Sequence, residues 1–375
     1  MNIGFYAPLK SPTSPTPSGD RLIGRLLIQA LEHCGHNVDL ISTFRSFDRD
    51  GNPHRQQRLK RLGRQIADQV IRRKGTDKLD LWFTYHLYHK APDWLGPKIA
   101  KKLAIPYVVA EASFAPKQQA GPWASGHAAV GAALAQTRLV IGLTKTDRAC
   151  VLPRLSDNAQ YKQLPPFLDS APFAAAAAHG CAHRRKLIGE HGLNGEVPWL
   201  LSVAMMRPGD KTESYAMLAE ALGSIANKQW QLLVVGEGPE LAHIQSLFAP
   251  LQDRVRWLGR QSADGLAGAY AASDIFVWPA VKETPGMCFL EAGAAGLPVV
   301  GGNGYGVPDV IRDGETGLLA DHLSVTDFAN KVSVLIDDEK MRRDMGLCAF
   351  DHVRNRHDIR TAGKVLDEAL GALVR

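Results

Sequence analysis

The chain has 375 residues, of which 45% are hydrophobic and 22% charged, and its formal net charge is +6. This length suits two domains of ordinary size, and the composition excludes a disordered or fibrous chain. The sequence holds no run of 18 apolar residues and no signal-peptide pattern at its start. We therefore expect neither a membrane-spanning helix nor a secretory leader.

The cysteines are five in number, scattered, and free of any C-x-x-C pair: Cys34, Cys150, Cys181, Cys288 and Cys348. An odd number at such spacings argues for free thiols, against a disulfide framework and against a zinc site. We therefore expect a cytoplasmic protein.

Positive charge is concentrated in the first part of the chain. Residues 1–165 carry 24 Lys and Arg against 12 Asp and Glu, a net +12, and the remainder is net −6. The densest basic run spans 54–74, and four apolar residues recur in it at helical spacing: Leu59, Leu62, Ile66 and Val70. We expect a surface helix whose apolar stripe packs on its own sheet. Its basic face could contact anionic lipid headgroups or an acidic acceptor, and nucleic acid is a weaker candidate because no recognised binding module is present.

The first 165 residues alternate between strand and helix patterns. Strands are predicted over 2–7, 37–41, 79–84, 106–110 and 139–143, with helices near 20–34, 55–74, 92–103, 124–136 and 145–152. The loop over 9–20 is rich in proline and serine, which predicts an extended segment leading into the first helix at Gly19. Such alternation predicts a parallel, doubly wound sheet with its functional edge at the carboxyl ends of the strands.

A second alternating run follows a looser stretch over 165–198. Within that stretch the alanines at 174–178 indicate a helix or a linker. Strands are then predicted over 199–203, 231–235, 255–258, 275–278 and 298–300, with helices between them. The pattern indicates a second doubly wound domain.

The most informative segment runs from Glu283 to Glu291. Thr284, Pro285 and Gly286 predict a loop that turns into a helix near Gly286. The free backbone N–H groups of Gly286, Met287 and Cys288 would then attract an anion. Glu283 precedes this helix and Glu291 lies about one and a half turns inside it. An anion site flanked by two carboxylates suits a sugar joined to a phosphate, although a solvated loop acid beside a helix acid is the simpler alternative.

This segment resembles the E-x7-E signature of the retaining, nucleotide-sugar-dependent glycosyltransferases of family 4, which have the GT-B fold. Three further runs resemble that family in order and spacing: 234–239, 255–259 and 306–319. The resemblance implies an α/β protein of two Rossmann-like doubly wound domains facing a cleft. Residues 1–168 would form the acceptor domain, with the helix over 352–375 packing back on it, and 169–351 the donor domain.

The resemblance also implies a cationic site for the leaving diphosphate, which needs such stabilisation when the sugar departs. Arg207 and Lys211 resemble the arginine and lysine that the family uses there, although the family's spacing is one residue longer. Loop cations that only keep a turn soluble are the alternative. Such enzymes need no metal and no cofactor beyond the donor. Asp48 and Asp50 match a D-x-D string that other glycosyltransferases use for a metal, but the segment reads as a surface loop.

Roles for the donor-binding residues follow from the same resemblance. Glu291 would accept hydrogen bonds from the ribose hydroxyls, Glu283 would face the sugar, and the backbone of Gly286, Met287 and Cys288 would hold sugar hydroxyls or phosphate. The remaining predicted contacts are those of Gly19 with the phosphates, Gly236 and Gly238 near the nucleotide, and Arg260 along the base. A turn of purely structural value explains Gly236 and Gly238 almost as well.

The acceptor side is less defined. Glu111 stands where many relatives carry a histidine after the fourth strand. A carboxylate there could orient an acceptor hydroxyl, act as a base or simply cap a loop. His86 and His89, after the preceding strand, are second candidates.

These features predict a retaining hexosyltransferase that uses a nucleoside diphosphate sugar, without a metal, on an envelope polysaccharide or lipid-linked acceptor. We expect it in the cytoplasm, with a peripheral position on the inner face of the membrane through 54–74. The alternatives are a sugar-nucleotide 2-epimerase and a catalytically degenerate nucleotide-sugar-binding protein.

Overall fold

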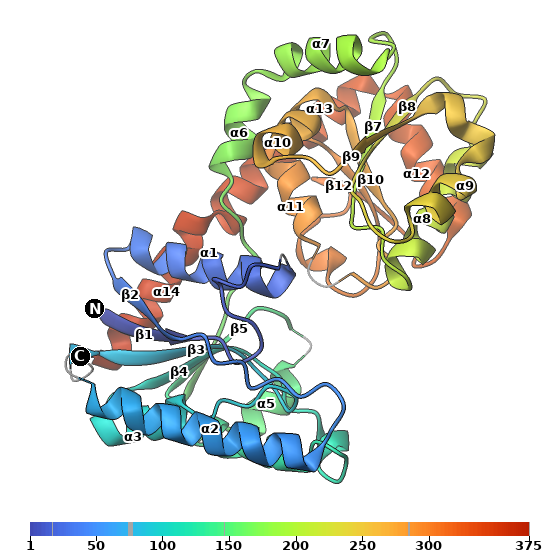
Figure 1. Ribbon diagram of the computed structural model, residues 1–375. Coiled ribbons are helices and arrows are strands. Elements are labelled where there is room, and N and C mark those ends of the chain that lie inside the picture. Colours follow the sequence, from blue (N-terminus) through green and yellow to red (C-terminus); the bar gives the residue numbers. More distant parts are fainter. Residues whose placement is uncertain (17, 74–77, 146, 284–285, 375) are drawn as a thin grey trace. The chain divides into compact units, whose positions relative to one another are not determined.

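The computed structural model describes residues 1–16, 18–73, 78–145, 147–283 and 286–374 (Figure 1). Contacts divide the chain into two compact units: unit 1 is Met1–Pro165 with Ile359–Arg375, and unit 2 is Pro166–Asp358. Thr284 and Pro285, which the sequence places in a loop, lie outside the described residues. None of the described helices is both long and apolar enough to cross a bilayer.

Unit 1 is built on a six-stranded parallel sheet in the order β2-β1-β3-β4-β5-β6. Its strands are β1 Asn2–Tyr6, β2 Asn37–Ser42, β3 Leu81–Leu87, β4 Tyr107–Ala112, β5 Leu139–Gly142 and β6 Gln160–Gln163. The five predicted strands are confirmed, whereas β6 was missed. Its sequence is Gln-Tyr-Lys-Gln on an edge of the sheet, so no buried apolar run marks it.

Helices cover this sheet, and the last helix of the chain belongs to the same unit (Figure 1). They are α1 Gly19–His33, α2 Pro53–Arg72, α3 Gly96–Leu103, α4 Ala124–Leu134, α5 Arg148–Val151 and α14 Ile359–Val374, with short 3-10 turns η2 Pro116–Gln118 and η3 Leu152–Arg154. α14 packs against α1, and a Cβ at Gly363 would lie 2.6 Å from the Ala30 carbonyl oxygen. The two helices approach this closely because Gly363 has no side chain.

The basic segment forms α2 as predicted, and Ile66 and Val70 of the expected stripe pack on the core of unit 1, whereas Leu62 does not. Leu62 is 41% exposed, and the buried residues of the helix are Gly63 and Ala67. A Cβ at Gly63 would come within 2.5 Å of the Trp94 side chain. Small residues therefore form the contact where a leucine was expected, because the neighbouring tryptophan fills the space.

Unit 2 repeats the architecture with the strand order β12-β11-β10-β7-β8-β9. Its strands are β7 Trp199–Val203, β8 Gln231–Val235, β9 Val255–Gly259, β10 Ile275–Trp278, β11 Val299–Gly302 and β12 Gly317–Ala320. Its helices are α6 Ala171–Ala177, α7 Gly180–His191, α8 Asp210–Ser224, α9 Leu241–Leu247, α10 Ala263–Ala272, α11 Met287–Ala294, α12 Val325–Asp337 and α13 Glu339–His352, with the short helices η4 Ala249–Arg254, η5 Val307–Asp309 and η6 Val353–His357. The predicted α/β class with two doubly wound sheets is confirmed, and β12 is the strand that was not predicted as one.

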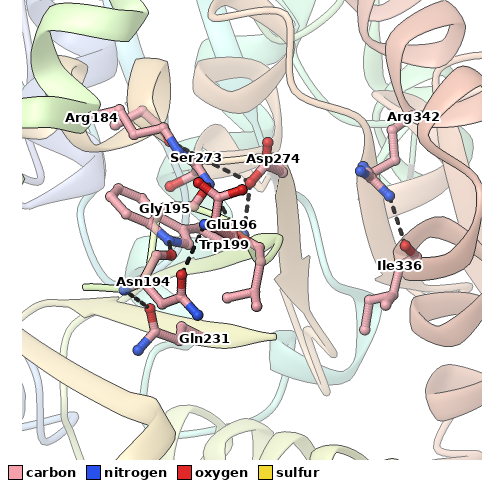
Figure 2. A network of polar contacts seen from close by, with 12 residues as sticks. Arg184, Asn194, Gly195, Glu196, Trp199, Gln231, Ser273, Asp274, Ile336 and Arg342 are labelled. Carbon is pink, nitrogen blue, oxygen red and sulfur yellow. Dashed lines mark hydrogen bonds and ion pairs between the residues drawn. The ribbon is translucent and has the colours of Figure 1, made fainter. Parts of the chain in front are cut away.

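The amino ends of the unit 2 strands are closed by a polar network around Arg184 (Figure 2). The Arg184 guanidinium donates to Asp274 Oδ2 at 2.8 Å and lies 4.0 Å from the Trp199 ring centroid. The backbone N–H of Trp199 donates to the same carboxylate oxygen at 2.7 Å. This network fastens α7 to the start of β7, which leaves the opposite, carboxyl edge of the sheet for function.

Candidate active site

Lys211 and Glu283 form an ion pair beside a buried tryptophan in unit 2. Lys211 lies in the first turn of α8, and Glu283 follows β10. Their side chains are 21% and 19% exposed, so solvent screens the pair only in part. The Trp278 indole N–H donates to Glu283 Oε2 at 3.3 Å, and the Lys211 ammonium lies 5.4 Å from the same ring. The tryptophan thus orients both charged groups.

The loop that carries Glu283 is tied to α8 by Ser214. The Ser214 hydroxyl accepts the Val281 N–H at 3.0 Å and donates to the Asp210 carbonyl at 2.8 Å. Lys211 places its positive charge near the amino end of α8, where the helix dipole disfavours a cation. Glu283 offsets this cost, and an anionic diphosphate would offset it as well.

Glu291 lies inside α11 and is oriented by Tyr270 of α10. The Tyr270 hydroxyl donates to Glu291 Oε2 at 2.8 Å and also lies 3.3 Å from the Cys288 carbonyl oxygen. Burial raises the pKa of the Glu291 carboxyl, and the hydrogen bond from Tyr270 opposes that rise. A carboxylate held away from water in one orientation is a prepared acceptor for ligand hydroxyls.

Lys211, Glu283 and Glu291 all influence the Cys288 thiol in the first turn of α11. Burial raises the pKa of the Cys288 thiol; Glu283 and Glu291 act in the same direction, and Lys211 opposes them. The first N–H groups of α11 have no partner inside the helix, which adds a site of positive potential to the same region.

Gly286 stands at the amino cap of α11 because a side chain would not fit there. A Cβ at this position would lie 2.3 Å from the Phe289 ring. The phenylalanine itself is buried in the core of unit 2. Packing alone therefore accounts for this glycine, and its N–H group stands beside the start of the helix.

Gly236 and Gly238 form a turn that packs directly on the loop after β7. A Cβ at Gly236 would lie 2.0 Å from the Ala204 carbonyl oxygen, and one at Gly238 would lie 2.1 Å from that of Met206. Gly236 also has a φ of 148°, which side chains rarely adopt. Close packing therefore explains both glycines. Because the turn contacts Ala204 and Met206, it also positions the loop that leads to Arg207.

Alanine at Gly238 is expected to destabilise unit 2 by about 1–3 kcal/mol, because the added methyl group must displace backbone. Thermal unfolding of the variant would measure this effect. Gly223→Ala is the matched control, since no atom lies within 4 Å of its Cβ position. Equal stability of the two variants would contradict the packing account.

The other predicted donor contacts are spread over the surface. Within the described part of the chain, the exposed Arg207 side chain has no hydrogen bond or ion pair. Arg260 is 67% exposed and lies 3.3 Å from Glu237. Gly19 starts α1 in unit 1, where Ser18 caps the helix. The Arg207 carbonyl accepts a hydrogen bond from the Thr212 hydroxyl at 3.0 Å, so Arg207 lies beside the start of α8.

The expectation for the D-x-D string needs a correction. The segment is a loop, but Asp48 is 2% exposed, so it does not lie at the surface. Its carboxylate accepts a hydrogen bond from Gln56 at 3.0 Å, and its carbonyl accepts one from the Trp123 indole at 3.0 Å. Asp48 holds α2 in place, and spacing alone does not distinguish this from a metal ligand.

Two strained residues stand side by side at the carboxyl edge of the unit 1 sheet. His86 in β3 has a φ of 63° and Glu111 in β4 a φ of 57°, both in the left-handed region. The strands pair at Tyr85 with Ala110 and at Leu87 with Ala112, so His86 and Glu111 are neighbours across the two strands. Such conformations cost about 1–3 kcal/mol each and persist mainly where the surrounding structure requires them.

Polar partners from other elements hold both residues. His86 Nδ1 lies 2.9 Å from Asp20 Oδ1 at the start of α1. Glu111 accepts the Leu143 N–H at 3.1 Å, and burial raises the pKa of its carboxyl. His89 packs against Trp123 instead, with its buried Nδ1 unpaired within the described part of the chain. The cluster therefore contains Asp20, which sequence reasoning did not predict as a partner.

Residues 184–350 match the family model described as "Glycosyl transferases group 1". This segment lies within unit 2 and contains the Lys211, Glu283 and Glu291 group. Unit 2 belongs to the group 1 glycosyltransferases. The family resemblance predicted for this part of the chain is confirmed.

Two curated relatives are similar to part of the chain. N-acetyl-alpha-D-glucosaminyl L-malate synthase of Bacillus anthracis is 34% identical over 167 residues, which are 44% of this chain and 42% of that protein. GDP-mannose-dependent alpha-(1-6)-phosphatidylinositol monomannoside mannosyltransferase of Mycobacterium tuberculosis is 30% identical over 207 residues, 52% of this chain and 51% of that protein. The chain thus spans about half or less of the length of these relatives.

Solved structures of similar fold cover nearly the whole of this chain. Sucrose-phosphate synthase from Thermosynechococcus elongatus has a TM-score of 0.72 at 19% identity, over 99% of this chain and 98% of that one. HepE of Anabaena in complex with UDP has a TM-score of 0.74 at 17% identity, over 100% of both chains. At this identity the likeness shows the fold alone, and both units share it.

Proposed function

We propose that the protein transfers a sugar from a nucleoside diphosphate sugar to an acceptor hydroxyl with retention of configuration. The observation that carries the proposal is the Lys211–Glu283 ion pair beside Trp278, together with the Glu291 carboxylate that Tyr270 orients in α11. The family of unit 2 supports it. Two similar proteins also support it: the mannosyltransferase relative depends on GDP-mannose, and HepE has been solved with UDP-glucose.

In this reaction the bond between the sugar and the diphosphate breaks, and the bonding electrons leave with the phosphate oxygen. Lys211 would stabilise that charge, Arg207 would assist from the loop, and no metal would be needed for this task. Glu291 would accept hydrogen bonds from the ribose and Glu283 from the sugar. The acceptor oxygen would attack the face that the diphosphate leaves, and its proton would pass to the departing phosphate.

The carboxyl edge of unit 1 would supply the acceptor side. Asp20 fixes the orientation of His86, and Glu111 stands beside it. Together they could hold an acceptor hydroxyl. We propose an envelope polysaccharide or a lipid-linked glycan as acceptor, and a cytoplasmic protein that contacts the inner membrane face through the basic segment 54–74.

Asparagine at position 86 is expected to lower acceptor transfer by about 10²-fold while leaving nucleotide binding unchanged. Asparagine tolerates a left-handed backbone, so His86→Asn removes the imidazole with little added strain. Transfer rates to a membrane extract and titration with UDP would measure the two effects. His33→Asn, on the exposed end of α1, is the matched control. Unchanged transfer in His86→Asn would remove His86 from the acceptor side.

The proposed function is tested by following a radiolabelled nucleotide sugar with and without membrane extract. A transferase should release nucleoside diphosphate faster when the extract is present and should label the extract. A 2-epimerase would convert the donor sugar at the same rate without extract. Binding without turnover would indicate a degenerate nucleotide-sugar-binding protein, and the last two outcomes would both contradict transfer.

A further inference from the structure

A groove in unit 1 lies between α2, α3 and α4. Its volume is about 700 Å³, within the ~300–1,000 Å³ typical of small-molecule sites. The helices that border it differ in character. α2 and α3 contribute cations, and α4 contributes small uncharged residues.

The cations are Lys60 and Arg64 of α2 and Lys98 and Lys101 of α3. The Lys98 ammonium lies 2.6 Å from the Asp68 carboxylate, and the Asp68 side chain is half exposed. Arg64 and Lys101 are both exposed, and neither has an ion-pair partner within the described residues. The groove therefore presents positive charge that no described residue of the protein neutralises.

The facing wall is formed by alanines of α4. Ala128 and Ala132 are exposed and Ala129 is half-buried, and α4 carries no Asp, Glu, Lys or Arg. The outward face of a surface helix ordinarily carries charged side chains. A run of exposed methyl groups beside a row of cations is suited to a ligand with an anionic end and an apolar end.

The acidic residue at the floor of the groove does not oppose such a ligand. Asp93 is 4% exposed, and its carboxylate accepts hydrogen bonds from within unit 1. Four groups donate to it: the hydroxyls of Thr84 and Tyr107 and the N–H groups of Leu95 and Gly96. Its oxygens are therefore turned toward the interior of unit 1.

We propose that this groove binds a single phosphate-bearing lipid, with its headgroup between Arg64 and Lys101 and the start of its acyl chain against the alanines of α4. Cations of this kind bind phosphate through charge-assisted hydrogen bonds. The alanine wall favours a lipid over a soluble phosphate, because a free phosphate has no apolar part to bury. The inference narrows the membrane contact proposed for 54–74 to one site, and it does not depend on sugar transfer.

Binding is tested by calorimetric titration of the full chain with dihexanoylphosphatidylglycerol below its micelle concentration. The double variant Arg64→Gln/Lys101→Gln is expected to bind this lipid about thirtyfold more weakly than the wild type, because it removes two cations from the phosphate. Arg61→Gln/Lys102→Gln removes the same charge from exposed positions of α2 and α3 that do not line the groove, and it is expected to bind like the wild type. Ala132→Glu, at an exposed position, is expected to abolish binding.

Other outcomes would overturn the site. Equal loss in the two double variants would mean that the basic surface acts as a whole. Equal binding of glycerol 3-phosphate would mean that the acyl chain is not recognised, and absence of binding by the wild type would end the proposal. A parallel titration with UDP keeps the two proposals apart, since the nucleotide site involves none of the substituted residues.

Discussion

Alanine in place of Lys211 is expected to lower the turnover of the nucleotide sugar by about 10²–10³-fold. The reason is the position of the ammonium group beside Glu283 and Trp278, where it is largely withdrawn from water and would face the charge that develops on the diphosphate. Turnover would be measured at saturating donor, so that loss of binding does not hide the effect. Nucleotide binding should weaken less than turnover, because the stabilisation is greatest in the transition state.

Lys282→Ala is the matched control for this prediction. Lys282 lies next to Glu283 in sequence, but its ammonium is half exposed and pairs with Asp210 at 3.1 Å. Its removal should change turnover little. If the two lysine variants turn over alike, the cation at Lys211 does not act on the leaving group.

Glutamine at position 291 is expected to weaken nucleoside diphosphate binding by about thirtyfold, which corresponds to about 2 kcal/mol for hydrogen bonds to a charged acceptor. The same variant should unfold at a higher temperature than the wild type at pH 7. Burial raises the pKa of Glu291, so its ionised form is disfavoured in the folded state. Calorimetric titration and thermal unfolding would measure the two effects.

The pH dependence of stability follows from the same shift. The folded protein holds the Glu291 proton to a higher pH than the unfolded chain does. Its stability contribution therefore falls as pH rises from the ordinary glutamate pKa through the raised pKa of the folded state. The advantage of Glu291→Gln should thus shrink on acidification. Glu339→Gln serves as control, because Glu339 is exposed and pairs with Arg343 at the surface. If Glu291→Gln binds the nucleotide as tightly as the wild type, Glu291 does not bind the ribose.

Much of the fold could be predicted from the sequence because both sheets are parallel and buried. Strands such as Leu81–Leu87 and Gln231–Val235 are near-continuous apolar runs, which the alternation with helices makes recognisable. The edge strand Gln160–Gln163 was not predicted because half of its residues face solvent. The stripe of α2 was predicted in part, because Ile66 and Val70 pack on the core. The exposure of Leu62 was missed, since Trp94, distant in sequence, fills the space beside Gly63.

The candidate site was predicted where a motif places residues on one loop and helix. Glu283 and Glu291 are only eight residues apart, and the sequence pattern predicted the start of α11 between them. Tyr270, Trp278 and Asp20 were not predicted as partners, since their contacts depend on how separate elements pack. Nothing in their spacing marks them. The burial of Asp48 was missed for the same reason.

Titration of the full chain with UDP, GDP and ADP tests the central claim most directly. We predict that one of them binds the wild type and raises its unfolding temperature, that Lys211→Ala binds it more weakly, and that Glu291→Gln loses most of its affinity. Failure of all three nucleotides to bind, or equal affinity in the wild type and both variants, would show that the groups around α11 do not form a nucleotide-sugar site.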